Sequence, residues 1–236
     1  MWPALQIETL SEDSLLLRFG EAIELSINAR VHAAAAQLQE RLVGIECVPA
    51  YASLLLRFDL AQWSDRDQLT PQQRVQEAVL AALQDGPNTA DSAREVEIPV
   101  LYGGVAGPDL DALAARAGMS EAQVIARHSA ATYRVAMLGF APGFPYLLGL
   151  DPALAVPRRV DPRIRVPAGS VAIGGNQTGI YPQELPGGWQ LIGRTPRVLF
   201  DLDAPSPSLL RPGDRVRFRS IYQDEYQRLE AAERHR

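Results

Sequence analysis

The feature that most constrains the fold is a stretch rich in glycine, proline and aromatic residues, Gly139 to Pro196. It holds 10 of the 18 glycines and 9 of the 18 prolines. Proline fixes φ and glycine permits positive φ, so such a stretch specifies its backbone path closely. A flexible linker would lack the aromatic and large aliphatic residues that follow each turn signal here. The stretch therefore predicts short strands and shaped loops, which commonly build a binding surface.

The charge of the chain limits the classes of partner that it can bind. The net charge is −5 at pH 7, and all 23 basic residues are arginine. An acidic surface argues against nucleic acids and membranes, which are polyanions, so neither is an expected partner. The lack of lysine excludes Schiff-base chemistry and a P-loop lysine. Residues 134–197 nevertheless carry seven arginines against three acids, a local excess of +4.

Cysteine content and the N-terminus indicate the compartment. Cys47 is the only cysteine, so no intrachain disulfide or cysteine metal cluster can form, which suits a reducing compartment. The N-terminal residues lack the basic and apolar regions of a signal peptide, and no apolar run reaches the roughly 18 residues of a membrane span. We predict a cytoplasmic protein without a metal site.

Residues 1–90 predict a small α+β domain built from two strand-strand-helix units. The run S-L-L-L-R-F occurs twice, from Ser14 and from Ser53, and alternates apolar side chains as a half-buried strand does. Six matching letters can also arise by chance. A short strand precedes each copy and an apolar-faced helix follows it. One antiparallel sheet covered by two helices is expected.

Residues 85–94 are polar and turn-forming, and we place the domain boundary there. The second domain, residues 95–236, begins with a strand at residues 96–102. Two helices follow: the first ends at Gly118, and Ser120 with Gln123 forms a capping box for the second. Beyond them the pattern predicts short strands and then a polar terminal helix.

The two helices resemble a helix-turn-helix, but we do not interpret them as a DNA-binding motif. Residues 96–133 hold two arginines against four acids, too few cations for phosphate contacts. His128, on the second helix, is a candidate proton carrier or substrate ligand because it lies just before the glycine- and proline-rich stretch. A histidine satisfied within the core is the alternative interpretation.

The arginines of the basic stretch are candidates for binding an anion. Four of them fall within eight residues, among prolines that prevent one solvated helical face. Planar guanidinium groups bind carboxylates and phosphates bidentately, although surface ion pairs are the alternative. The aromatic residues Phe140 and Phe144 lie between Pro142, Gly143 and Pro145, and we expect them to line a groove for substrate or a partner. The four arginines are Arg158, Arg159, Arg163 and Arg165.

Four sequence blocks in the second half resemble the B-subunit family of 5-oxoprolinase, also called allophanate hydrolase subunit 1, which includes the kinase inhibitor KipI. The resemblance implies a C-terminal, mainly-β cyclophilin-like barrel after a small α+β domain. The blocks are G-F-A-P-G-F-P-Y-L from Gly139, P-R-R-V-D-P-R-I-R-V-P-A-G-S from Pro157, G-G-N-Q-T-G-I-Y-P from Gly174 and G-G-W-Q-L-I-G-R-T-P from Gly187.

The resemblance also implies a function. Family members of this type act with the 5-oxoprolinase C subunit (KipA-like), whose barrel is related, and with a third component, the A subunit, to hydrolyse 5-oxo-L-proline to L-glutamate at the expense of ATP. ATP would phosphorylate the lactam oxygen and activate the carbonyl toward water, and arginines would stabilise the charge. No recognisable nucleotide loop occurs, so ATP binding is expected wholly or partly in the partner. A kinase inhibitor and a carboxyltransferase-type lobe related to urea carboxylase are the alternatives.

These considerations predict two groups of site residues and an ATP-dependent amidohydrolase that acts only within a complex. The predicted catalytic residues are His128, Arg163 and Arg165. The predicted substrate- or partner-binding residues are Phe140, Phe144, Arg159, Asn176, Gln177, Tyr181 and Arg194.

Overall fold

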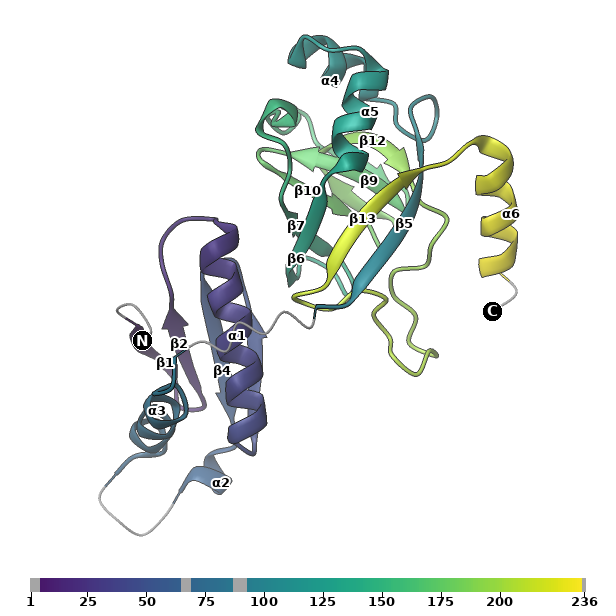
Figure 1. Cartoon of the computed structure of the whole chain (residues 1–236). Coiled ribbons are helices and arrows are strands. Elements are labelled where there is room, and N and C mark those ends of the chain that lie inside the picture. The colour runs from purple at the N-terminus through teal and green to yellow at the C-terminus, as the bar shows by residue number, and fades with distance from the viewer. Residues whose placement is uncertain (1–4, 65–68, 87–92, 235–236) are drawn as a thin grey trace. The chain divides into compact units, whose positions relative to one another are not determined.

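The computed structural model describes residues 5–64, 69–86 and 93–234 (Figure 1). The chain divides into two compact units, residues 1–92 and residues 93–236. The boundary predicted at residues 85–94 falls largely on residues 87–92, which lie outside the described residues.

The N-terminal unit contains a four-stranded antiparallel sheet in the order β1-β2-β4-β3. The two copies of the repeated run form its central strands, and Leu15 pairs with Leu56 as Leu17 pairs with Leu54. The short helix α2 was not expected from the sequence. The elements are β1 (Gln6–Ser11), β2 (Ser14–Arg18), α1 (Leu25–Arg41), β3 (Ile45–Pro49), β4 (Ser53–Phe58), α2 (Leu60–Trp63) and α3 (Pro71–Ala82).

Helices α1 and α3 cover one face of this sheet. The four paired leucines of β2 and β4 are fully buried and share one core with apolar residues of both helices. The apolar spacing of α1 and α3 places Val31, Leu38, Val75 and Val79 on that core, as an amphipathic helix requires. A capping box of Thr70 starts α3 immediately before Pro71.

The C-terminal unit contains a closed barrel of seven strands in the order β10-β7-β6-β13-β5-β12-β9. All neighbours pair antiparallel except β5 and β13, which are parallel. The glycine- and proline-rich stretch forms short strands with shaped loops, as predicted. The elements are β5 (Glu95–Tyr102), α4 (Leu110–Ala117), α5 (Glu121–Ala130), β6 (Thr132–Leu138), β7 (Pro145–Leu148), η1 (Pro152–Leu154), β8 (Arg163–Val166), β9 (Ser170–Gly174), β10 (Gln177–Ile180), β11 (Leu185–Gly187), β12 (Gln190–Arg194), β13 (Arg215–Ser220) and α6 (Gln223–Glu233).

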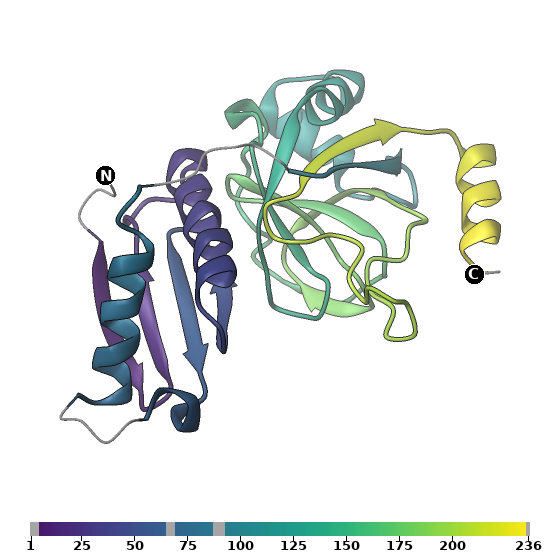
Figure 2. The same ribbon diagram turned by 60° about the horizontal axis from the view of Figure 1, so that its bottom comes forward.

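Helices α4 and α5 lie at one end of the barrel (Figures 1 and 2). Gly118 ends α4 with φ of 65°, and Ser120 and Gln123 form the predicted capping box of α5. Leu113 of α4 and Val124 of α5 belong to the same core as the strands that line the barrel. The apolar faces of the helix-turn-helix pattern therefore serve barrel packing.

Strands β8 and β11 pair with each other as a separate two-stranded sheet. A second core joins this sheet to the barrel through aromatic side chains. Packing as well as turns therefore holds β8, which carries Arg163 and Arg165, in position. The buried members of this core are Phe144, Val166, Ala172, Tyr181, Trp189 and Leu191.

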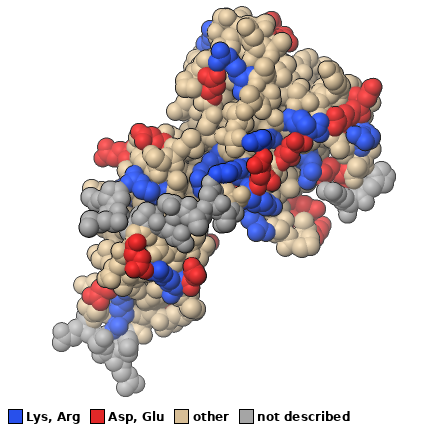
Figure 3. Space-filling model, in the orientation of Figure 1, with Lys and Arg blue, Asp and Glu red and all other residues tan. Residues whose placement is uncertain are grey.

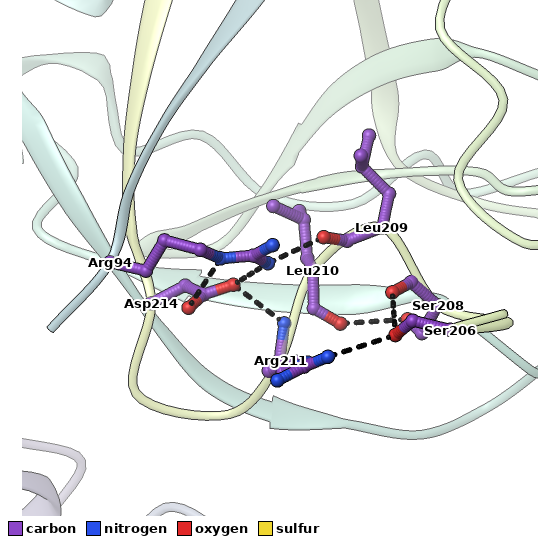
Figure 4. A network of polar contacts seen from close by, with 7 residues as sticks. All are labelled: Arg94, Ser206, Ser208, Leu209, Leu210, Arg211 and Asp214. Carbon is purple, nitrogen blue, oxygen red and sulfur yellow. Dashed lines mark hydrogen bonds and ion pairs between the residues drawn. The ribbon is translucent and has the colours of Figure 1, made fainter.

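A polar network joins the first residues of the C-terminal unit to the entry of β13 (Figure 4). The Arg94 guanidinium forms an ion pair with Asp214, whose side chain is 7% exposed, and donates to the carbonyl of Leu209. Asp214 also accepts the backbone N–H of Arg211. Because β5 and β13 lie at opposite ends of this unit's sequence, the network fixes both ends at one place.

The terminal helix α6 lies beside the barrel (Figure 2) and has no fully buried residue. Ion pairs tie it to the barrel: Arg219 with Glu225 and Arg197 with Glu233. Among the described residues, no helix is long and apolar enough to cross a membrane.

Candidate functional site

Asp109, at the start of α4, is a buried carboxylate that binds two of the predicted arginines. Its side chain is 8% exposed. Arg163 donates two hydrogen bonds to it, Nη1 to Oδ2 at 2.8 Å and Nη2 to Oδ1 at 2.7 Å, and Nη1 of Arg159 lies 3.4 Å from Oδ1. The backbone N–H of Leu191 also donates to Oδ2, at 2.7 Å. Asp109 therefore ties α4 to β8 and β12.

The hydrogen bonds from Arg163 to Asp109 hold β8 against the start of α4. The fork of the Arg163 guanidinium faces Asp109, so an anionic substrate would have to compete with a fixed carboxylate. The predicted catalytic role of Arg163 and the binding role of Arg159 stay predictions. Asp109 itself was missed because its partners lie 50, 54 and 82 residues away in sequence; an Asp before a helix indicates only a cap.

The other two predicted arginines have partners of their own. The Arg165 side chain is 79% exposed, and its Nε lies 3.6 Å from Oε1 of Glu184. Arg194 donates from Nε to the carbonyl of Ala168 at 2.9 Å. On the face in view in Figure 3, basic side chains likewise lie beside acidic ones. The local excess of arginine is therefore distributed among several contacts.

The polar block from Gly174 contributes mostly buried groups. Gln177 begins β10 and is 8% exposed, whereas Asn176 is exposed in the two-residue turn after Gly174, in which Gly175 has φ of 66°. Tyr181 is 2% exposed, and a Cβ at Gly187 would lie 2.2 Å from its Oη. Only glycine leaves room for the Tyr181 hydroxyl at this position of β11.

Phe144 does not line a groove, which corrects the sequence prediction. Its side chain is 2% exposed and packs edge-to-face against Tyr181 and Trp189, with ring centroids 5.2 and 5.8 Å apart. The Pro and Gly residues around it were expected to keep it out of the core. Pro142 and Gly143 form a turn and Pro145 begins β7, and the Phe144 ring between them points into the core.

Phe140, from the same motif, is 61% exposed. The N–H of Ala141 donates to the carbonyl of Gly139 at 2.8 Å, so Phe140 is the central residue of a three-residue turn. Its φ is 69°, and it is the one non-glycine residue with positive φ in the described part of the chain. This is the strained form of the γ-turn, and strained residues cluster at functional sites.

His128 is fully buried, and both ring nitrogens are hydrogen-bonded. Nδ1 lies 2.8 Å from Oη of Tyr102 and Nε2 lies 3.0 Å from Oγ1 of Thr178. Thr178 donates its own hydroxyl hydrogen to the carbonyl of Ala172, which assigns the proton of the neutral imidazole to Nε2 and makes Tyr102 the donor to Nδ1. The ring also stacks on Phe218, with centroids 4.5 Å apart.

These contacts favour the alternative interpretation, a histidine satisfied within the core, over a proton carrier or substrate ligand. Burial lowers its pKa to about 3, so the imidazole is neutral near pH 7. Its ring partners are a tyrosine hydroxyl, a threonine hydroxyl and aromatic rings, so the structure does not bring it to the arginines. In the sequence, the four-residue spacing from Val124 to His128 was the sign that both side chains lie on the same buried face of the helix.

We expect His128 to make stability depend on pH. Its pKa is about 3 when folded against the ordinary histidine value of 6.5, so the unfolded chain binds one more proton between these values. The contribution is complete above about pH 6.5 and is lost at up to about 1.4 kcal/mol per pH unit as pH falls toward 3. Urea unfolding at pH 7 and pH 5 should show that His128→Gln reduces the difference by about 2 kcal/mol. An equal pH dependence in both proteins would contradict this assignment.

In the ranges that the structure describes, no group of three His, Cys, Asp or Glu side chains is arranged to hold a metal ion.

Comparison with known proteins places the chain in a family. The family model of the carboxyltransferase domain, subdomain C and D, matches residues 5–210. The chain is 44% identical over 227 residues to the 5-oxoprolinase B subunit of Bacillus subtilis (strain 168), a match that covers 94% of this chain and 95% of that protein. The chain belongs to the B-subunit family of 5-oxoprolinase. The resemblance drawn from the four sequence blocks is thereby confirmed.

Solved structures of similar proteins agree with this family. The crystal structure of TTHA0988 has a TM-score of 0.74 at 42% identity and matches 89% of this chain, but the chain spans only 40% of that longer protein. PH0987 from Pyrococcus horikoshii, a conserved uncharacterized protein, has a TM-score of 0.56 at 39% identity, and the match covers 94% of this chain and all of that protein. The fold therefore occurs both as a separate chain and as part of a longer one.

Proposed function

We propose that this protein is a subunit of an ATP-dependent 5-oxoprolinase complex that hydrolyses 5-oxo-L-proline to L-glutamate. The observation that carries the proposal is the 44% identity to the 5-oxoprolinase B subunit of Bacillus subtilis over nearly the whole of both proteins. The proposed complex also contains the C subunit, whose barrel is related, and the A subunit, and it acts in the cytoplasm. The proposed class of the barrel is cyclophilin-like.

The phosphate-binding groups for ATP are proposed to lie in the other subunits. Arg159 and Arg163 face the buried carboxylate of Asp109. The N-terminus of α5 is occupied by the capping box of Ser120 and Gln123. Arg159, Arg163 and the N-terminus of α5 are thus engaged with protein groups, which supports the proposal that ATP phosphates bind elsewhere in the complex.

A second candidate function is a carboxyltransferase-type lobe, because the matching family model is that of a carboxyltransferase domain. The near-complete match to a 5-oxoprolinase subunit favours the first candidate. A regulatory inhibitor of a histidine kinase is the remaining alternative from the sequence.

We expect the purified chain alone to form no glutamate from 5-oxo-L-proline and ATP, and to support this reaction when mixed with the A and C subunits of its own organism. Glutamate and ADP released in parallel are the measurement, with the mixture lacking this chain as the control. Turnover by the single chain would contradict its role as a dependent subunit. A complete mixture that forms no glutamate would contradict the proposed function itself.

A further inference from the structure

Arg158 is the member of the four-arginine cluster that lacks a carboxylate partner among the described residues. Arg159 and Arg163 contact Asp109, and Arg165 lies near Glu184. The guanidinium of Arg158 instead lies over the Trp189 ring, with Cζ 5.6 Å from the ring centroid. This cation–π contact fixes the position of the charge but leaves its hydrogen-bond donors unsatisfied by a protein acid.

The charge of Arg158 lies close to a half-buried phenol. Burial raises the pKa of Tyr146, and Arg158 opposes this shift. Tyr146 also packs against the Trp189 ring, with centroids 6.0 Å apart. A cation, a phenol and an indole thus meet at one place on the outside of the barrel, and all three are side chains that concentrate binding energy at protein interfaces.

Phe140 extends this group through a chain of ring contacts. Its ring lies edge-to-face on Phe144, with centroids 5.4 Å apart, and Phe144 in turn contacts both Tyr146 and Trp189. The buried Phe144 therefore supports an exposed aromatic on one side and the Arg158 platform on the other. We call Phe140, Tyr146, Arg158 and Trp189 the arginine–aromatic surface.

Two observations favour a protein as the occupant of this surface. Phe140 is 61% exposed and is presented by a strained turn, whereas Trp189 is 5% exposed beneath Arg158. The Trp189 ring is thus already covered. The surface presents the projecting Phe140 ring and the Arg158 charge, and these do not form a concave pocket for a small molecule. In addition, the matching part of TTHA0988 belongs to a longer chain, of which this chain spans 40%. In that protein, further polypeptide is therefore attached to the same fold.

We propose that the arginine–aromatic surface is the docking site for the related barrel subunit, which presents a carboxylate to Arg158 and an apolar side chain to Phe140. This inference rests on the proposed function for the identity of the partner. The local charge of this chain supports an acidic group on the partner, since Arg158 lies over Trp189 in a region with an excess of +4. The strain at Phe140 is retained because the turn holds the ring outward, where the partner covers it.

The test is the dissociation constant between the purified chain and the C subunit, measured by calorimetry. Arg158→Ala and Phe140→Ala are each expected to weaken binding about tenfold to a hundredfold, as truncation of central interface residues does. Arg158→Lys is expected to weaken binding as well, because lysine keeps the charge but lacks the planar fork that binds a carboxylate with two hydrogen bonds. The binding of wild type is expected to weaken more steeply with salt than that of Arg158→Ala.

The matched controls are Arg116→Ala and Tyr222→Ala, an exposed arginine of α4 and a tyrosine that is 87% exposed. Both controls should bind as wild type does. Wild-type affinity in Arg158→Ala and Phe140→Ala, with unchanged melting temperature, would overturn the docking site while the complex still forms glutamate. A complex that assembles through these residues but forms no glutamate would instead overturn the proposed function. No binding of wild type to the C subunit would overturn the docking site.

Discussion

Phe144→Ala is expected to lower the free energy of unfolding by about 3–5 kcal/mol, the range for truncating a buried phenylalanine. The ring packs against Tyr146, Tyr181 and Trp189 and is 2% exposed. Its loss leaves a cavity between the barrel and the β8–β11 sheet, where these rings cannot close in without moving the strands that carry them. Denaturant unfolding followed by Trp189 fluorescence, with Trp2 and Trp63 replaced by Phe, measures the effect.

Phe140→Ala is the matched comparison, since it removes the same side chain four residues earlier. Phe140 is 61% exposed, so the change should cost less than about 1 kcal/mol. Phe140→Gly should be no worse, because glycine adopts a φ of 69° without strain. Equal destabilisation by the two alanine variants would contradict the assignment of one ring to the core and the other to the surface.

Asp109→Ala is expected to cost about 2–4 kcal/mol, below the 3–5 kcal/mol of a fully buried pair because Arg163 is partly solvated. The variant leaves the Arg163 guanidinium and the N–H of Leu191 without their shared acceptor. Because these contacts join α4, β8 and β12, we expect faster hydrogen exchange in β8 and β12 as well as lower stability. Hydrogen-exchange mass spectrometry measures the local effect.

Arg165→Ala is the control for Asp109→Ala. The pair of Arg165 and Glu184 is exposed and 3.6 Å long, so its loss should cost less than about 1 kcal/mol. Arg163→Lys should resemble Asp109→Ala in direction, because lysine keeps the charge but cannot form two parallel hydrogen bonds. If Arg163→Lys instead lowers the turnover of the complex without altering stability, Arg163 acts on substrate and the structural interpretation is wrong.

The sequence predicted features that depend on neighbouring residues. The alternation in the two S-L-L-L-R-F runs, the capping box at Ser120 and the left-handed Gly118 each reflect local backbone preferences, and each occurs in the structure. The short strands of the basic stretch followed for the same reason. Local backbone preferences act over a few residues, so they can be predicted without knowledge of the tertiary fold.

The orientation of side chains within the site could not be predicted. Phe140 and Phe144 occupy equivalent places in the motif G-F-A-P-G-F, and only the distant Tyr181 and Trp189 decide which ring is buried. Asp109 meets Arg163 across 54 residues, a distance at which no spacing rule applies. For His128, on helix α5, both interpretations were open, and the hydroxyl groups that satisfy it come from Tyr102 on β5 and Thr178 on β10.

The parallel pairing of β5 with β13 has a consequence for synthesis of the chain. Arg215 pairs with Glu95, and Asp214 binds Arg94 across 120 residues. The first strand of the barrel in sequence therefore cannot pair fully until the last one has been made. During translation the N-terminal unit can fold while the ribosome is still making the barrel, whereas the barrel stays open until β13 has left the exit tunnel. Long-range closure of this kind folds slowly and leaves strand edges unpaired in the meantime. We therefore expect the nascent C-terminal unit to expose unpaired strand edges for longer than the N-terminal unit does.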